Sequence, residues 1–285
     1  MGRAALTSQT SPSWNPLRCD GTALPPGWLL AAKLLAYHVF RSQSSVGAGP
    51  PFLPFVPWLD SPVFAAWLAP ATATAFYGSL VCLFLNRWVR PACLVMAGCV
   101  LVHVAGHRLA YANNLMFATV FLLLIGLYDP RTGQWPLRIQ LAIVYGGACL
   151  NKALDPDWWN GRFLDTLMID ALRMGWYDRL ASRFADHTLG MVGGALTIAA
   201  EATICASVLV SRGGHLGVLL MVAFHVVMLA ATRGQLSVPF TCASVAVAAA
   251  FFHPLVSVSS RWIEPALWWA VVLAVRIAPF LLILV

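Results

Sequence analysis

The stretch IQLAIVYGGACLNKALDPDWWNG, residues 139–161, decides how this chain is interpreted. A largely apolar run leads to Asn151 and Lys152 and then meets an Asp-Pro-Asp-Trp-Trp-Asn-Gly turn. This pattern predicts a membrane-embedded helix that ends at a polar boundary. Among the eighteen Lys and Arg residues, only Lys33 and Lys152 are lysines. Lysine loses its proton on desolvation far more readily than arginine, so Lys152 is the first candidate for a functional amine.

The composition is that of a membrane protein. Hydrophobic residues make up 60% of the 285 residues, charged residues 10%, and the mean hydropathy is +0.75. These values predict an all-α, polytopic membrane helix bundle in contact with the lipid bilayer. The net charge of +7 comes from arginines scattered singly between apolar segments, which argues against nucleic acid as a partner. Seven cysteines without a CxxC pattern indicate neither a disulfide framework nor a thiolate metal site.

About eight or nine transmembrane helices are expected, because nine apolar segments approach the 20-residue length of a span. The segments are 27–41, 63–86, 91–109, 113–128, 137–154, 188–210, 214–232, 236–253 and 264–285. Residues 1–26 are a polar tail without an apolar signal-peptide core. Residues 27–285 are expected to form a single transmembrane domain.

The loop arginines predict the orientation in the cell membrane. If the chain has nine spans, eight loop arginines gather on one side of the membrane: Arg3, Arg18, Arg87, Arg90, Arg131, Arg138, Arg212 and Arg261. The other side's short loops hold only Arg41, Arg108 and Arg233. The N-terminus is therefore expected to be cytoplasmic, with Lys152 and residues 155–187 facing outward. Apolar and charged residues alternate in 155–187, which suits either amphipathic interfacial helices or a small cap packed on the spans.

Helix rise predicts two layers of polar residues by depth. Measured from the cytoplasmic ends, Lys152 lies at ~22 Å and His107 at ~24 Å, near the outer boundary and level with Asn113 and Asn114. A second layer lies nearer the middle of the membrane. It contains Glu201 at ~14 Å, His225 at ~17 Å, and Arg276 and His103 at ~18 Å. These depths favour Arg276 over Lys152 as the partner of Glu201, in an ion pair or a structural polar network.

Several residues of the opening stretch together resemble a known family. They are Gln140, the Ile-Val-Tyr ending at Tyr145, Ala148 and Cys149, Lys152, the Asp157–Trp158 pair and Gly161. This order resembles the membrane domain of vitamin K-dependent γ-carboxylase and its bacterial HTTM relatives, mainly over 28–252 and most closely over 139–161. Glu201 and His225 also resemble family positions. Two departures are the turn after Lys152, which is one residue longer, and Leu115, which stands where the family has a histidine.

The resemblance implies an enzyme in which Lys152 takes a proton from reduced vitamin K or menaquinone. Oxygen then converts the quinol to an epoxide, and the strong base so formed allows carboxylation of a substrate. The cofactor-binding residues would be His107, Asn113, Asn114, Tyr145 and Trp158. Because the chain ends at Val285 without the carboxylase's lumenal domain, a small or peptide substrate, or one delivered by a partner protein, is expected.

A non-catalytic alternative remains open on the sequence alone. The chain would then be a transporter, an assembly factor, or an accessory to peptide maturation or immunity. Lys152 would pair with Asp155 or Asp157, or extend to the membrane interface as a helix-end charge. His103 and His107, spaced i and i+4, would hydrogen-bond between helices, since no third ligand supports a metal site.

Overall fold

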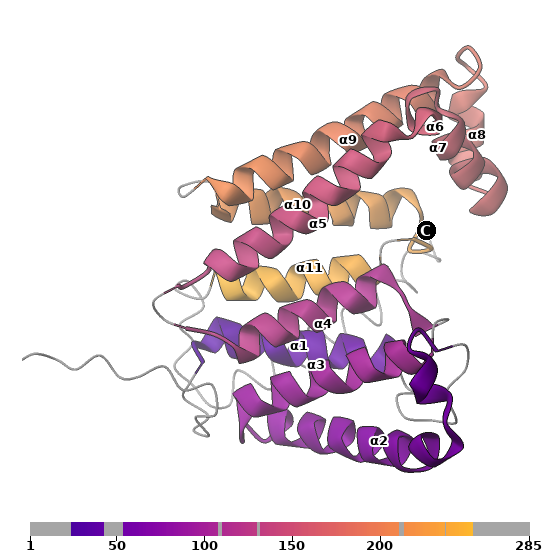
Figure 1. The fold of residues 1–285 in the computed structure, drawn as a ribbon. Helices are drawn as coiled ribbons and strands as arrows, with labels where there is room; N and C mark the ends of the chain where they lie inside the picture. The colour runs from indigo at the N-terminus through magenta and orange to yellow at the C-terminus, as the bar shows by residue number, and fades with distance from the viewer. Residues whose placement is uncertain are drawn as a thin grey trace, which may run out of the picture.

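The computed structural model describes residues 24–42, 54–107, 110–129, 132–210, 214–236 and 238–252, and it confirms an all-α chain. Within these ranges, eight helices of 14 or more residues run back and forth in alternating directions (Figure 1). They are α1 (Pro26–Ser42), α2 (Pro62–Phe84), α3 (Val89–Gly106), α4 (Asn113–Gly126), α5 (Trp135–Leu154), α9 (Thr188–Leu209), α10 (Gly214–Ala231) and α11 (Val238–Phe251). The predicted helical segments among these residues therefore match helices to within a few residues.

One apolar core joins these helices. α1 packs against α4 and α11, α2 packs on α3, and α10 lies between α9 and α11. The α5 helix packs mainly against α9, so these two helices form one side of the bundle (Figure 1). Phe76, Phe121 and Phe251 are among the largest fully buried side chains. Because these three buried residues belong to α2, α4 and α11, the core extends across the bundle.

Four helices in the described part of the chain are long and apolar enough to cross a membrane. They are α2 from Ala66, α3, α9 and α10. By helix length and composition the chain is a multi-pass membrane protein, but the prediction of eight or nine spans is wrong, because only these four helices of the described residues qualify. α1, α4 and α11 have 17, 14 and 14 residues, which is short of about 20, and α5 carries several polar residues. The segment 264–285 lies outside the described residues.

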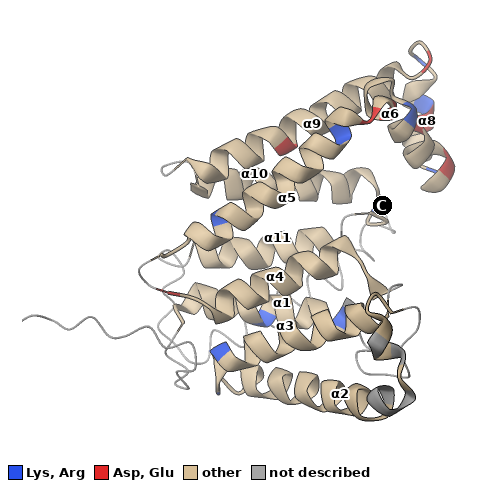
Figure 2. Cartoon of the chain, viewed as in Figure 1, with Lys and Arg blue, Asp and Glu red and all other residues tan. Residues whose placement is uncertain are grey.

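Residues 155–187, which we call the cap, fold at one end of α5 and α9. The cap contains α6 (Pro156–Trp159), α7 (Arg162–Asp165), the π-helix η3 (Thr166–Ala171) and α8 (Gly175–Ala181). Pro156 cannot continue the hydrogen-bond ladder of α5, so α5 ends before it and Asp155 caps α6. Because α6, α7 and α8 all contact α9, the cap is packed on the bundle rather than spread as separate long amphipathic helices. Charged residues gather in it (Figure 2).

Arginines at the opposite end of the bundle bind helix C-termini. Arg90 donates through Nε to the Gly126 carbonyl at 3.1 Å and through Nη2 to the Tyr128 carbonyl at 2.7 Å, at the end of α4. Arg138 Nη1 donates to the Val210 carbonyl at 3.4 Å, at the end of α9. These carbonyls have no partner within their own helices, so the arginines stabilise the end distant from Lys152.

Candidate functional site

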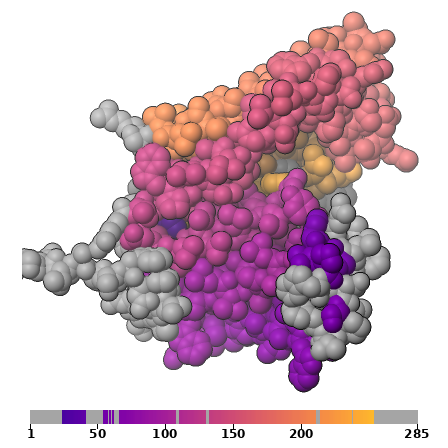
Figure 3. Space-filling view, viewed as in Figure 1, coloured from indigo at the N-terminus to yellow at the C-terminus, as the bar shows by residue number. Residues whose placement is uncertain are grey.

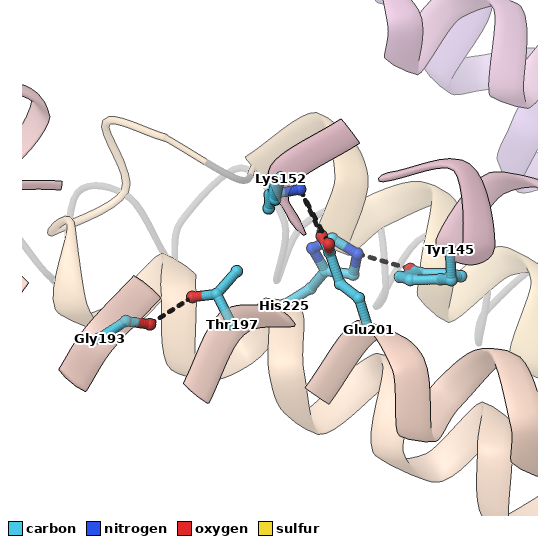
Figure 4. Close-up of polar contacts among 6 residues, drawn as sticks. All are labelled: Tyr145, Lys152, Gly193, Thr197, Glu201 and His225. Atoms are coloured by element: carbon cyan, nitrogen blue, oxygen red, sulfur yellow. Dashed lines mark hydrogen bonds and ion pairs between the residues drawn. The ribbon is translucent and has the colours of Figure 1, made fainter. Parts of the chain in front are cut away.

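The centre of the candidate site is an ion pair between α5 and α9. Lys152 Nζ donates to both carboxylate oxygens of Glu201, at 2.8 and 2.9 Å (Figure 4). The Glu201 side chain is 7% exposed and that of Lys152 is 20% exposed. A largely buried charge is stable only with a close partner of opposite charge, and Lys152 and Glu201 provide that partner for each other.

The direction of the two helices explains why these residues meet. Side chains lean toward the N-terminus of their own helix. α5 ends at the cap and α9 begins there, so Lys152 leans away from the cap and Glu201 leans toward it. Lys152, which the ranking by depth made the poorer partner of Glu201, is therefore bonded to it. The expected contact with Arg276 lies outside the described residues.

A second polar pair lies beside the first. The Tyr145 hydroxyl and His225 Nε2 are 2.7 Å apart, and both residues are buried (Figure 4). The His225 ring stacks on Phe240 of α11, with ring centroids 5.6 Å apart. The hydroxyl of Tyr145, a residue expected to bind a cofactor, thus pairs with His225. The four polar residues Tyr145, Lys152, Glu201 and His225 come from three helices and form the polar cluster.

Trp158 covers the ammonium of Lys152. The turn after α5 brings the Trp158 ring to 5.2 Å from Lys152 Nζ, a cation–π distance. The ring also stacks on Phe163 of α7, with centroids 4.3 Å apart. On the other side, Gly194 of α9 lies so close to the Trp158 carbonyl that a side chain there would overlap it. The cap therefore holds Trp158 firmly in place.

A cavity of about 560 Å³ opens beside Lys152. It lies between α4 and α5, with Phe240 of α11 on its wall, and Figure 3 shows atoms of α11 in the hollow between these helices. Polar and aromatic side chains share its lining, which is Tyr111, Asn113, Met116, Phe117, Val120, Gln140, Val144, Gly147, Ala148, Asn151, Lys152, Asp155, Trp158 and Phe240. Such a lining suits a small ligand with both an aromatic and a hydrogen-bonding part.

The structure brings only some of the predicted site residues to this cavity. Lys152, Asn113 and Trp158 line it, and Asn113 Oδ1 accepts from the Tyr111 hydroxyl at 3.1 Å. Asn114 points elsewhere, with its amide nitrogen 3.5 Å from His38 Nε2. Asp155 and Asp157, the alternative partners of Lys152, instead accept from the Asp157 backbone and from the Asn160 side chain.

His103 and His107 lie apart from the cavity, near the end of α3. Their rings are 4.6 Å apart, and His107 Nδ1 lies 3.2 Å from the His103 carbonyl. Both ring nitrogens of His103 are buried without a hydrogen-bond partner. Within the part of the chain that the structure describes, the expected hydrogen bond of His103 to another helix is therefore absent. No group of three or more potential metal ligands occurs in the described ranges.

Sequence reasoning missed a cluster inside the cap. Asp165 Oδ1 accepts from the Tyr177 hydroxyl at 2.6 Å, and Asp165 Oδ2 lies 2.7 Å from His187 Nδ1. Burial, together with the hydrogen bond to Asp165, raises the pKa of Tyr177 above its ordinary value. The cluster ties the cap to the start of α9. The one signal in the sequence was the run of glycines Gly190, Gly193 and Gly194, which allows close packing on α9.

No family model, curated protein or solved structure matches this chain.

Proposed function

We propose that this chain is a multi-pass membrane enzyme that oxidises a reduced quinone, with Lys152 as the general base. The observation that carries the proposal is a lysine amine that lines a cavity of about 560 Å³ while its charge is balanced by Glu201. The resemblance of residues 139–161 to the γ-carboxylase and HTTM family supports it. We propose the family's orientation as well, with a cytoplasmic N-terminus and the cap outside.

The cavity has the groups that a quinol ring requires. Phe117, Phe240 and Trp158 offer aromatic faces, and the side chains of Asn113 and Asn151 offer hydrogen bonds. A quinol hydroxyl bound there would lie beside Lys152. The hypothesis needs no metal ligand.

Glu201 gives Lys152 a way to act as a base. The ammonium must first lose a proton, and both carboxylate oxygens of Glu201 lie within 2.9 Å of it. Transfer of that proton gives a neutral amine and a neutral carboxylic acid, and burial favours neutral forms. The amine then accepts a proton from the quinol hydroxyl. Overall, one quinol and one O₂ give one quinone epoxide and one water, so two quinol hydrogens and one oxygen atom leave as water.

The finer part of the proposal concerns a second substrate. In the family that the chain resembles, the base formed during epoxidation abstracts a proton from a glutamate side chain, and carbon dioxide adds to the carbanion. We extend this coupling to a small or peptide substrate, delivered by a partner protein where needed.

A non-catalytic membrane protein is the second candidate, and one observation favours it. Lys152 already has two acceptor oxygens and an aromatic face, as expected for a structural ion pair. In that case the pair would hold α5 against α9 in a transporter, an assembly factor, or an accessory to peptide maturation or immunity.

One experiment separates these candidates. The full chain would be purified into lipid nanodiscs and supplied with reduced menaquinone or vitamin K and oxygen, and quinol loss and epoxide formation would be followed. Lys152→Arg keeps the charge but removes the base, so we expect no epoxide from it. Lys33→Arg, at the second lysine, is the matched control and should retain activity. If the wild type and Lys152→Arg bind quinol equally and neither makes epoxide, the result would favour a structural role for Lys152.

A further inference from the structure

A second cavity, of about 800 Å³, lies on the α9–α10 side of the bundle. Its walls are α9 and α10, two of the four helices suited to cross a membrane, and its lining reaches from Leu189 to Ile204 along α9. At a rise of 1.5 Å per residue this length is roughly 22 Å. The size falls within the roughly 300–1,000 Å³ of ligand sites. We call this cavity the apolar groove.

The polar side chains of the groove are all satisfied inside the protein. Three threonines donate to carbonyls of their own helices: Thr197 to Gly193, Thr203 to Ala199 and Thr232 to Met228, at 2.7 to 2.8 Å. Figure 4 shows the first of these contacts, one turn before Glu201. Trp176 Nε1 donates to the Ala231 carbonyl at 3.0 Å, and the Tyr177 hydroxyl donates to Asp165. A ligand in the groove therefore meets hydrocarbon.

The cap closes one end of the groove. Leu164 and Met168, together with Trp176 and Tyr177, line that end, and the hydrogen bond from Trp176 to Ala231 fixes α8 against the end of α10. Among the described residues nothing covers the sides, since Leu196 and Val227 are 65% and 64% exposed. The groove is thus a built site with a closed end and a lateral opening toward the lipid.

We infer that the apolar groove binds one acyl chain of a bilayer phospholipid. Acyl chains are the hydrocarbon that surrounds α9 and α10 in a membrane, and they enter laterally and can end below the cap. A partner membrane helix fits less well, because the cap closes one end of the groove. A helix about 10 Å wide that crosses the whole bilayer would also meet Trp176 and Tyr177. This site is independent of the chemistry proposed for Lys152.

The occupant would lie against α9, the helix that carries Glu201. Thr197 and Ile204 line the groove on either side of Glu201 in the sequence, while Glu201 itself faces Lys152. The bound chain therefore packs on α9 beside the face that carries Glu201.

Photolabelling tests this inference. The full chain would be placed in nanodiscs of phosphatidylcholine with a diazirine in one acyl chain, illuminated and mapped by peptide mass spectrometry. We expect several-fold more label on Leu196, Val227 and Met228 than on Trp67 of α2, which is 76% exposed outside the groove. Ala200→Trp fills the groove and should remove most of that excess. Ala202→Trp, an exposed position of the same helix outside the lining, should leave it unchanged.

Further arms keep the test decisive. If Ala200→Trp does not fold, Val227→Trp gives the same readout at a position that is already exposed. Excess unlabelled menaquinone should leave the label in place. Even labelling of all lipid-facing helices, or labelling that Ala200→Trp does not change, would overturn the inference. Displacement by menaquinone would also overturn it, since the occupant would then be an isoprenoid chain.

Discussion

Lys152 of α5 and Glu201 of α9 form an ion pair because their side chains lean toward each other along the helix axes. Each side chain leans toward the other because α5 and α9 run in opposite directions. The pair joins two helices. Lys152 lies in the last turn of α5, next to the cap, and Glu201 lies inside α9, which is long and apolar enough to cross a membrane. Stability and any proton transfer at Lys152 therefore depend on the same contact.

Glu201→Gln should destabilise the protein by removing the counter-charge of Lys152. Breaking a fully buried pair costs about 3–5 kcal/mol, and the partial exposure of Lys152 reduces our expectation to roughly 2 kcal/mol. The measurement is the thermal midpoint of unfolding in detergent. The double variant Lys152→Met with Glu201→Leu should regain most of the loss, since it leaves no unpaired charge. Asp157→Asn, at an exposed position, is the control. Additive losses in the double variant would contradict the pairing.

Tyr145→Phe should lower stability rather than affinity for quinol. The variant removes the hydroxyl that pairs with His225 Nε2, at a cost of about 1–3 kcal/mol. Asn113→Ala, at the cavity wall, should lower the affinity for quinol rather than stability. It should weaken quinol binding about five- to tenfold, as expected for one hydrogen bond of about 1 kcal/mol. Quenching of tryptophan fluorescence by the quinol would report binding for both. Weak binding by Tyr145→Phe at unchanged stability would return Tyr145 to the ligand site.

The sequence predicts the helices well because long apolar runs are a direct signature of helices in lipid. The segment predicted at 214–232, for example, is α10 at Gly214–Ala231. The number of spans is less predictable, since the run at 113–128 forms a helix of only 14 residues. An apolar run marks burial as readily as it marks a full crossing of the bilayer.

Contacts between side chains are where sequence reasoning fails. Depth arithmetic places residues along an axis but ignores the lean of each side chain, so it separated Lys152 from Glu201. Tyr145 was predicted to bind a cofactor, but its partner His225 is 80 positions away, and only the folded structure brings these two side chains together. The cluster around Asp165 depends on the fold of the cap, which follows no simple periodicity.

Gly190→Ala should separate the cap from α9. A methyl group at Gly190 would overlap the Gly161 carbonyl and crowd the Asp165 carboxylate, so the backbone of the cap would have to move. We expect a loss of several kcal/mol, in the range of overpacked cores or more. Gly98→Ala is the matched control, because its added methyl meets nothing within 4 Å and alanine favours a helix by roughly 1 kcal/mol. Limited proteolysis of the cap would be the readout, and equal cleavage rates in both variants would contradict the close packing.

The stability of the cap should fall at high pH through Tyr177. Burial first, and then the hydrogen bond and charge of Asp165, raise the pKa of Tyr177 above the ordinary value of about 10. The folded protein then holds the phenol proton more tightly than the unfolded chain, so this contribution to stability is present below about pH 10 and declines as the pH rises further. Proteolysis of the cap measured from about pH 8 to 11 should accelerate more in the wild type than in Tyr177→Phe. The variant starts from lower stability because Asp165 loses a donor, but it lacks the titrating group. Parallel pH profiles for the two proteins would show that Tyr177 keeps an ordinary pKa and that the cap opens for another reason.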